Sequence, residues 1–271
     1  MIKRIAAIGG DSRTIYLIEI LKNKGYSAEN LVSGGDLDVL RNCDAVILPM
    51  PFTRDGVTVN APFSKEPILI KEIASQCGNR PAFGGYFGKA ASIFQNPFDY
   101  GVRDETAIPN AVATAEGAIS IAIEKLPITV FGMKCLVTGY GKVAKCLSER
   151  LKALFADVTV AARKPKDLLW AEERGFRPLP FSMLSENLFE FDCIFNTVPE
   201  KVLCEKELIN VRQDAYIIEL ASSPGGVDKE AAARHNVNVI SAPSLPGKTA
   251  PKTSAEIIFN CIEGIISEEK L

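Results

Sequence analysis

The chain has 271 residues, 47% hydrophobic and 24% charged, with a formal net charge of −2 and a single histidine. This is the composition of an ordinary globular protein with a sizeable core, so it argues against wholesale disorder. Acidic and basic residues are interspersed. That pattern argues against binding to nucleic acid or to an anionic membrane, because both depend on clustered positive charge.

The cysteines and the N-terminus indicate the compartment. The seven cysteines lack C-x-x-C spacing and several lie in apolar runs, so they are interpreted as buried free thiols and not as disulfides or metal ligands. The first apolar run is too short for a signal peptide, and no window is expected to reach the roughly 20 apolar residues of a membrane span. We therefore expect a cytoplasmic protein without a bound metal.

In the first part of the chain, β-branched apolar runs alternate with segments of helical period, which is typical of parallel α/β sheets. A loop rich in turn residues, with a short hairpin-like piece, is expected over 49–67. The pattern predicts strands over 3–10, 44–50 and 80–86, and helices over 13–25, 67–78 and 87–97.

The second part of the chain repeats this alternation. It opens with a long helix that Pro109 is expected to begin and that ends before Pro127. Strands are predicted over 134–140, 157–163, 176–180, 193–199, 216–222 and 237–243, with helices between most of them.

These elements predict a two-domain α/β protein. We expect a smaller N-terminal flavodoxin-like α/β domain over 1–105 and a C-terminal Rossmann-type doubly wound parallel sheet over 106–252, with 106–126 as the interdomain helix. A last helix over 253–268 carries an apolar stripe that must be buried, and the N-terminal domain is its expected partner. The stripe consists of Ala255, Ile258, Phe259, Ile262, Ile265 and Ile266.

A glycine turn joins the strand at 134–140 to the following helix. It has the form G-x-G-x-x-A, in which Gly139 permits a tight turn, Gly141 lets backbone approach a pyrophosphate, and Ala144 allows close packing of helix on strand. Strand, turn, helix and second strand are in register, so we predict a dinucleotide site. Its expected contacts are Gly139, Tyr140, Gly141, Lys142 and Val143.

The tip of the next strand indicates which dinucleotide. An acidic residue is usual there in NAD sites, but this chain has Ala162 followed by Arg163 and Lys164. Two cations suit the 2′-phosphate of NADP(H), which is the predicted cofactor, with NAD as the alternative. Two further strand tips are expected to line the ribose and nicotinamide. Their residues are Thr197, Val198, Pro199, Ala221 and Ser222.

His235 is expected at a helix end, on the opposite edge of the sheet from the ligand site. Without a histidine in the site, His-assisted ketone reduction, Ser-His hydrolysis and His-ligated zinc lose support. Hydride transfer to or from a C–C or C–N bond remains.

Candidate substrate groups come from both parts of the chain. Ser12 and Arg13 begin a helix and Arg54 lies in the long loop, so the two arginines could bind two carboxylates. Glu116 falls on the stripe Val112, Glu116, Ile119, Ile123, where a carboxylate is costly unless paired, and is a candidate proton acceptor.

The segment 242–255 is expected to be a stiff loop that brings cations to the cleft mouth. Lys248 in this loop is assigned a catalytic role. Lys252 and Thr114 are assigned to substrate binding.

Several segments together resemble the A subunit of dipicolinate synthase. They are "IGGDSR", "AVILPMP", "IPNAVATAEGAI", "VTVAARK", "IFNTVP", "ELASSPGGVD" and "APSLPGKTAPKTSAEII", in the same order over nearly the whole chain. The resemblance implies NAD(P)-dependent oxidation of a dihydrodipicolinate-type ring from lysine biosynthesis to pyridine-2,6-dicarboxylate, the compound stored in bacterial spores. It also implies that the partner is a second, flavoprotein-like B subunit.

Two features depart from the family pattern. The turn reads "GYGKVA" where relatives commonly end in Arg-Thr-Gly, and Ser223 stands where many relatives have a basic residue.

Whether the protein forms a homodimer is left open. The alternatives are a two-domain 2-hydroxyacid dehydrogenase, an adenosylhomocysteinase-like enzyme, and a non-catalytic NADP(H)-binding subunit.

Overall fold

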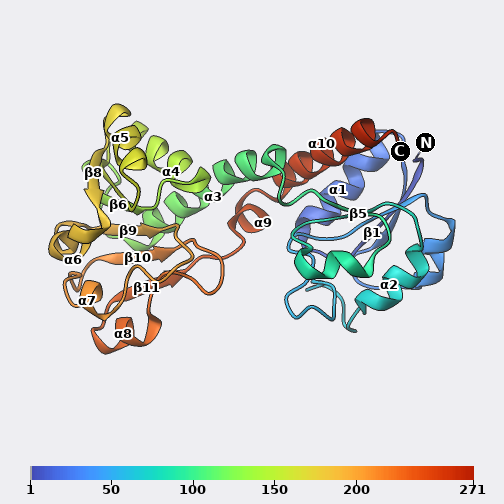
Figure 1. Cartoon of the computed structure of the whole chain (residues 1–271), viewed down its shortest axis with the longest axis horizontal. Helices are drawn as coiled ribbons and strands as arrows, with labels where there is room; N and C mark the ends of the chain where they lie inside the picture. Colours follow the sequence, from blue (N-terminus) through green and yellow to red (C-terminus); the bar gives the residue numbers. More distant parts are fainter. Residues whose placement is uncertain (1) are drawn as a thin grey trace. The chain divides into compact units, whose positions relative to one another are not determined.

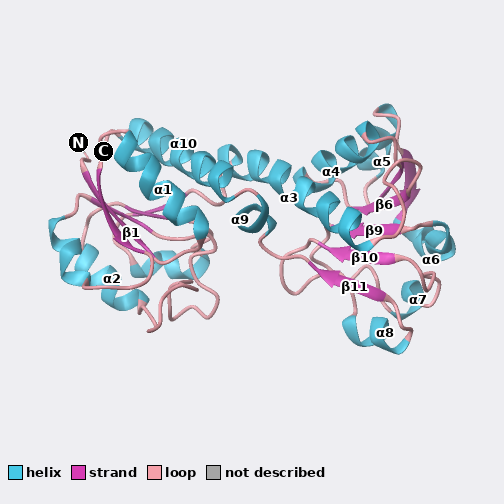
Figure 2. Cartoon of the chain, turned by 180° about the vertical axis from the view of Figure 1, so that it is seen from behind, coloured by secondary structure: helices cyan, strands magenta, loops and turns pink. Residues whose placement is uncertain are grey.

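The computed structural model describes residues 2–271, which form two compact units. The first unit holds residues up to Asn110 together with Ala250–Leu271, and the second holds Ala111–Thr249. Each unit is a parallel β-sheet with helices on both faces (Figure 1 and Figure 2). The predicted α/β class is therefore confirmed.

The sheet of the first unit has the order β2-β1-β3-β4-β5, the flavodoxin-like arrangement. Its strands are β1 (Arg4–Ile8), β2 (Ser27–Leu31), β3 (Ala45–Ile47), β4 (Ala82–Gly84) and β5 (Pro97–Asp99). Its helices are α1 (Ser12–Asn23), η1 (Leu37–Asn42), α2 (Ile70–Cys77), η2 (Gly88–Ile93) and α10 (Pro251–Glu269).

The sequence pattern does not reveal two strands of this sheet. The strand β2 reads Ser-Ala-Glu-Asn-Leu and lies at one edge of the sheet, where polar side chains reach solvent and no apolar alternation develops. The strand β5 lies at the other edge and has only three residues, all half-buried. Edge strands of this kind carry little hydrophobic signal.

Both faces of the first sheet are covered. One face packs against α1 and α10, which lie side by side in both views (Figure 1 and Figure 2). The apolar stripe of α10 is buried there, with Ile258, Phe259 and Ile262 at 5% exposure or less. The other face packs against α2, η1 and η2.

The sheet of the second unit has the order β11-β10-β9-β6-β7-β8, which is the Rossmann order. Its strands are β6 (Lys134–Thr138), β7 (Asp157–Ala162), β8 (Arg177–Pro180), β9 (Cys193–Asn196), β10 (Tyr216–Glu219) and β11 (Asn238–Ser241). All of its strand pairs are parallel.

Helices cover both faces of this sheet as well. The core on one face includes side chains of α3, α4 and α5, and the core on the other face includes α6, α7 and α8. The helices are α3 (Asp104–Lys125), whose first residues up to Asn110 belong to the first unit, α4 (Lys142–Ala153), α5 (Pro165–Glu173), η3 (Phe181–Met183), α6 (Leu184–Asn187), η4 (Leu188–Glu190), α7 (Glu205–Leu208), α8 (Lys229–Arg234) and α9 (Leu245–Thr249).

The helix α3 corrects two expectations. It begins at Asp104, so Pro109 lies inside it instead of opening it. Asp104 and Glu105 occupy the first turn, where negative charge favours a helix start. The second expectation was that no segment would be long and apolar enough to span a membrane, but α3 is. Core helices can meet the same criterion, and half of the most apolar window of α3 is buried inside the protein.

Candidate functional site

A cleft of about 320 Å³ lies where β6, β7 and β9 of the second unit end. Carboxyl ends of neighbouring parallel strands form the usual ligand crevice of this fold. Five predicted cofactor residues line it: Gly139, Tyr140, Arg163, Lys164 and Val198. The rest of its lining is Ala162, Asp167, Phe181, Glu200, Lys201 and Val202.

The two glycines of the turn have different physical reasons to be glycine. Gly139 has φ +88°, and a Cβ there would lie 2.8 Å from Thr197 Oγ1, so both backbone and packing require glycine. Gly141 has an ordinary φ of −81°, and a Cβ there would meet no protein atom within 4 Å. Nothing in the protein itself therefore demands glycine at position 141, while a closely approaching ligand would.

The helix that follows the turn has no side-chain cap. Gly141 is the N-cap of α4 and provides no side-chain acceptor for the first turn. The exposed start of a 12-residue helix concentrates N–H groups and positive dipole charge. Together with the open space at Gly141, this end of α4 fits a pyrophosphate.

The predicted cations lie at the cleft, and one of them has an acidic partner. Arg163 Nη1 lies 3.1 Å from Glu200 Oε2, and the two side chains are 70% and 67% exposed. Lys164 is also exposed and lines the same cleft. Sequence reasoning missed Glu200, because no local pattern places residue 200 opposite residue 163.

A buried polar network shapes the strand tips behind the cleft. Thr138 Oγ1 donates to Asn196 Oδ1, and Asn196 Nδ2 donates to Glu219 Oε1 at 2.7 Å. These residues end β6, β9 and β10, and Glu219 is only 5% exposed. A signal was present in the sequence: each is a polar residue that closes an apolar strand.

Glu219 organises the loop that follows β10. Its Oε2 accepts the amides of Gly226 and Val227 at 2.9 Å, and its Oε1 accepts that of Ala221 at 3.1 Å. A buried carboxylate is stable only with such donors. Ala221 and Ser222, both predicted to contact cofactor, are thereby held next to β10, half-buried and exposed respectively.

The remaining predicted cofactor residues lie within three positions in the chain of residues that line the cleft. Thr197 Oγ1 donates to the carbonyl of Thr138 at 2.7 Å and packs against Gly139. Lys142 and Pro199 are exposed and Val143 is half-buried. None of these four side chains belongs to the lining of the cleft.

The glycine turn of the first unit is already filled by protein. A Cβ on Gly10, which has φ +87°, would lie 2.0 Å from Thr14 Oγ1. Asp11 caps α1 by accepting the Arg13 amide at 3.1 Å. The helix start predicted at Ser12 and Arg13 as an anion site therefore already carries a carboxylate.

Arg13 is a buried cation with an internal counter-ion. It is 6% exposed, its Nε and Nη2 lie 2.9 and 2.8 Å from the Asp11 carboxylate, and Nη2 also donates to the Met50 carbonyl. Burial raises the pKa of the Asp11 carboxyl, but hydrogen bonds and charge from Arg13 outweigh it and hold this pKa below the ordinary 3.8. Only Nη1 of Arg13 lacks a partner among the described residues.

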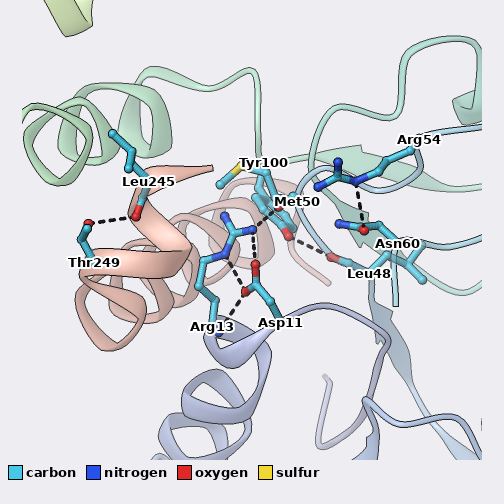
Figure 3. A network of polar contacts seen from close by, with 9 residues as sticks. All are labelled: Asp11, Arg13, Leu48, Met50, Arg54, Asn60, Tyr100, Leu245 and Thr249. Carbon is cyan, nitrogen blue, oxygen red and sulfur yellow. Dashed lines mark hydrogen bonds and ion pairs between the residues drawn. The ribbon is translucent and has the colours of Figure 1, made fainter. Parts of the chain in front are cut away.

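The other predicted arginine is exposed to solvent. Arg54 lies in the long loop, and its Nε donates to Asn60 Oδ1 at 3.3 Å (Figure 3). The expected hairpin-like piece is present as isolated antiparallel bridges from Thr53 to Val59 and from Thr58 to Leu69.

The interpretation of Glu116 as a carboxylate on a buried stripe is wrong. Its side chain is 62% exposed and lies 3.6 Å from Arg150 Nε, and Ile123 on the same stripe is 60% exposed. The stripe is therefore split: Ile119 is buried in the core with Ala115, Ala118 and Ala122, while Glu116 and Ile123 are exposed to solvent. Thr114, close to Glu116 on the helix, is half-buried.

The segment 242–255 is not the stiff loop that was expected. Residues Leu245–Thr249 form α9, and α10 already begins at Pro251. Thr249 Oγ1 donates to the Leu245 carbonyl at 2.8 Å (Figure 3) and packs against Gly117 of α3, where a Cβ would lie 3.0 Å away. Lys248 and Lys252 are exposed on these helices.

His235 ends α8, as predicted, and its Nε2 contacts Glu205 of α7. The seven cysteines are free thiols, five of them buried. Among residues 2–271 no group of three or more His, Cys, Asp or Glu side chains could hold a metal ion.

The chain is similar to known proteins over its whole length. It is 30% identical to the A subunit of dipicolinate synthase from Bacillus subtilis (strain 168), covering 98% of this chain and 96% of the relative. The chain belongs to the family of the dipicolinate synthase A subunit. The model of that family's N-terminal domain matches residues 4–91. The resemblance noted in the sequence is therefore confirmed.

Two solved structures, one of them from this family, have folds similar to that of the chain. The crystal structure of the dipicolinate synthase A subunit from Bacillus halodurans is 27% identical, covers 97% of each chain and has a TM-score of 0.87. The NAD-dependent formate dehydrogenase of Staphylococcus aureus, solved in complex with NAD, has a TM-score of 0.61 at 14% identity and covers 98% of this chain and 95% of its own. The second likeness shows that the chain shares the fold of this dehydrogenase.

Proposed function

We propose that the chain is a nicotinamide-dependent oxidoreductase that converts a dihydrodipicolinate-type ring to pyridine-2,6-dicarboxylate. The observation that carries the proposal is the cleft at Gly139 and Arg163, with open space at Gly141 and an uncapped α4. The substrate class rests on the family, whose members are named dipicolinate synthase.

In this proposal the second unit holds the dinucleotide. The start of α4 and the amides around Gly141 would bind the pyrophosphate, and Arg163 with Lys164 would bind the 2′-phosphate of NADP(H). The bound nicotinamide would supply the hydride acceptor. The loop at Ala221 and Ser222, fixed by Glu219, would position the nicotinamide end.

The chemistry needs little from the protein beyond positioning. A dihydro ring loses a hydride from one carbon and a proton from a neighbouring position, and aromatisation drives the step. No histidine is required. Glu116, exposed and paired with Arg150, is not retained as the proton acceptor.

We assign the ring to the first unit, the domain predicted over 1–105. Arg13 supports this, because it is a buried guanidinium held rigid by Asp11 with Nη1 left to bind one carboxylate oxygen. Arg54 would bind the second carboxylate. Ser12, Thr114, Lys248 and Lys252 stay predictions for the substrate side.

We also propose that the partner is a second, flavoprotein-like subunit, and that the protein is located in the cytoplasm. The relatives are named as one of several subunits, which supports a multi-subunit enzyme.

The test is cofactor binding followed by turnover. NADPH and NADH would be titrated into the purified chain by calorimetry, with Arg163→Ala as variant and Arg177→Ala, whose arginine pairs with Glu190 away from the cleft, as control. Loss of a charge-assisted contact should weaken NADPH binding by about 10- to 100-fold in Arg163→Ala and leave NADH binding unchanged.

Turnover decides the reaction. Freshly generated dihydrodipicolinate and NADP⁺ or NAD⁺ would be added to the chain alone and with its partner subunit, and reduced cofactor and pyridine-2,6-dicarboxylate would be measured. Product in neither sample would refute the reaction. Binding of cofactor without turnover by the chain alone, followed by turnover with the partner, would identify a subunit that needs its partner for catalysis.

A further inference from the structure

The proposed 2′-phosphate site has an acidic side chain at its edge. Glu200 follows β9 and Arg163 follows β7, both line the same cleft, and their side chains meet at 3.1 Å. We propose that Glu200 sets the choice between NADP(H) and NAD(H) by opposing a 2′-phosphate and accepting a ribose hydroxyl. The inference rests on the proposed dinucleotide site and deepens it.

The backbone around Glu200 is fixed on both sides. Before it, the amide of Val198 donates to Asn196 Oδ1 at 3.2 Å. After it, Lys201 Nζ donates to the Val227 carbonyl at 2.8 Å, and the amide of Val202 donates to the Gly226 carbonyl at 3.0 Å. These hydrogen bonds hold the segments on both sides of Glu200, whose side chain lines the cleft.

The charges at the cleft are nearly balanced. Arg163, Lys164 and Lys201 are basic, and Asp167 and Glu200 are acidic. Of the two acids, Glu200 is the one in an ion pair with Arg163, so it competes directly with any anion for that guanidinium. The net positive charge available to a phosphate is therefore smaller than Arg163 and Lys164 alone would suggest.

The two dinucleotides respond to Glu200 in opposite ways. A 2′-phosphate on Arg163 would lie a few ångströms from the Glu200 carboxylate, and like charges at that distance in an exposed site oppose binding on the order of tenfold. The 2′-hydroxyl of NAD is a hydrogen-bond donor, and a carboxylate is the acceptor that usually binds it. Glu200, which follows β9, would then bind the ribose hydroxyl that an acidic residue at the end of β7 binds in NAD sites.

The experiment compares cofactor preference in wild type, Glu200→Gln and two control variants. NADPH and NADH affinities would be measured by titration at low salt, where exposed charges act most strongly. Glu200→Gln should raise the ratio of NADPH to NADH affinity by about tenfold. Glu190→Gln, which removes the same charge from a pair with Arg177 outside the cleft, should leave the ratio unchanged.

Asp167→Asn identifies which acid acts. It should change the ratio less than Glu200→Gln does, because Asp167 makes no ion pair with Arg163 among the described residues. A ratio unchanged in Glu200→Gln, or a larger shift in Asp167→Asn, would overturn the inference while wild-type binding still supports the proposed site. Absence of binding of either cofactor to wild type would overturn both.

Discussion

The two halves of the chain each contain a glycine-rich strand-to-helix turn, and the two turns differ in what fills them. After β1, Gly9 and Gly10 lie against Val59 and Thr14 at distances that leave no room for a Cβ. After β6, Gly139 is also packed against protein, but Gly141 faces open space. One turn is closed by its own chain and the other is open to a ligand.

The helices that follow differ in the same way. Asp11 caps α1 and carries the charge that an anion would bring, whereas α4 has no side-chain cap. The N-terminus of a helix favours a negatively charged group, and in α1 the Asp11 carboxylate is that group. A glycine turn therefore indicates a phosphate site only where its space and its helix amides are not already used.

Replacing Gly10 by alanine should show the structural role of the first turn. The new Cβ would clash with Thr14 and would force a left-handed φ on a non-glycine residue. We expect the free energy of unfolding to fall by about 3 kcal/mol. Urea denaturation measures this, and NADPH affinity of the folded variant should not change. A stable variant with weakened cofactor binding would reverse the assignment of the two turns.

Gly141→Ala should have the opposite profile. With an ordinary φ and open space, alanine should alter the free energy of unfolding by no more than about 0.5 kcal/mol. The methyl group would occupy the proposed pyrophosphate position and should cost about 2–3 kcal/mol of binding, roughly 100-fold in affinity. Urea denaturation and NADPH titration of the same variant measure the two effects.

Gly264→Ala is the matched control for Gly141→Ala. Gly264 lies in α10, and a Cβ there also meets no atom within 4 Å. Cofactor affinity should be unaffected by this change. Equal affinities in Gly141→Ala and wild type would show that the open space at the second turn is not the pyrophosphate site.

The charge of Asp11 should give the first turn a pH-dependent stability. Because its folded pKa lies below 3.8, Asp11 binds a proton less readily in the folded state than in the unfolded state. Its contribution is therefore present above about pH 4 and is lost as pH falls through the folded pKa. Asp11→Asn should lower the free energy of unfolding by about 1–2 kcal/mol at neutral pH.

The difference between wild type and Asp11→Asn should then shrink below about pH 4. Denaturation curves at neutral pH and at a series of acidic pH values measure it. A difference that stayed constant down to the lowest pH at which both proteins fold would contradict the charged pairing with Arg13.

Much of the architecture could be predicted from local patterns. The strands at 134–138 and 193–196 are buried apolar runs, and the stripe of α10 is buried as its period indicated. The edge strand at 27–31 was not predicted, because its largely exposed and half-buried residues show no alternation of apolar and polar side chains. The stripe through Glu116 was misleading because only Ile119 of it is buried; the rest of the buried face of α3 is made largely by alanines, and small side chains contribute little to a hydrophobic pattern.

Neighbouring residues in the chain were enough to establish the α/β class, the glycine turn at 139–141 and the cations at 163–164, since each of these features is local. Which charges face one another became known only from the folded chain. Glu200 pairs with Arg163, which lies 37 residues earlier in the chain, and Asn196 donates to Glu219 at the end of the neighbouring strand. Electrostatic partners are set by distances in space, and parallel strands bring together tips that are far apart in the chain.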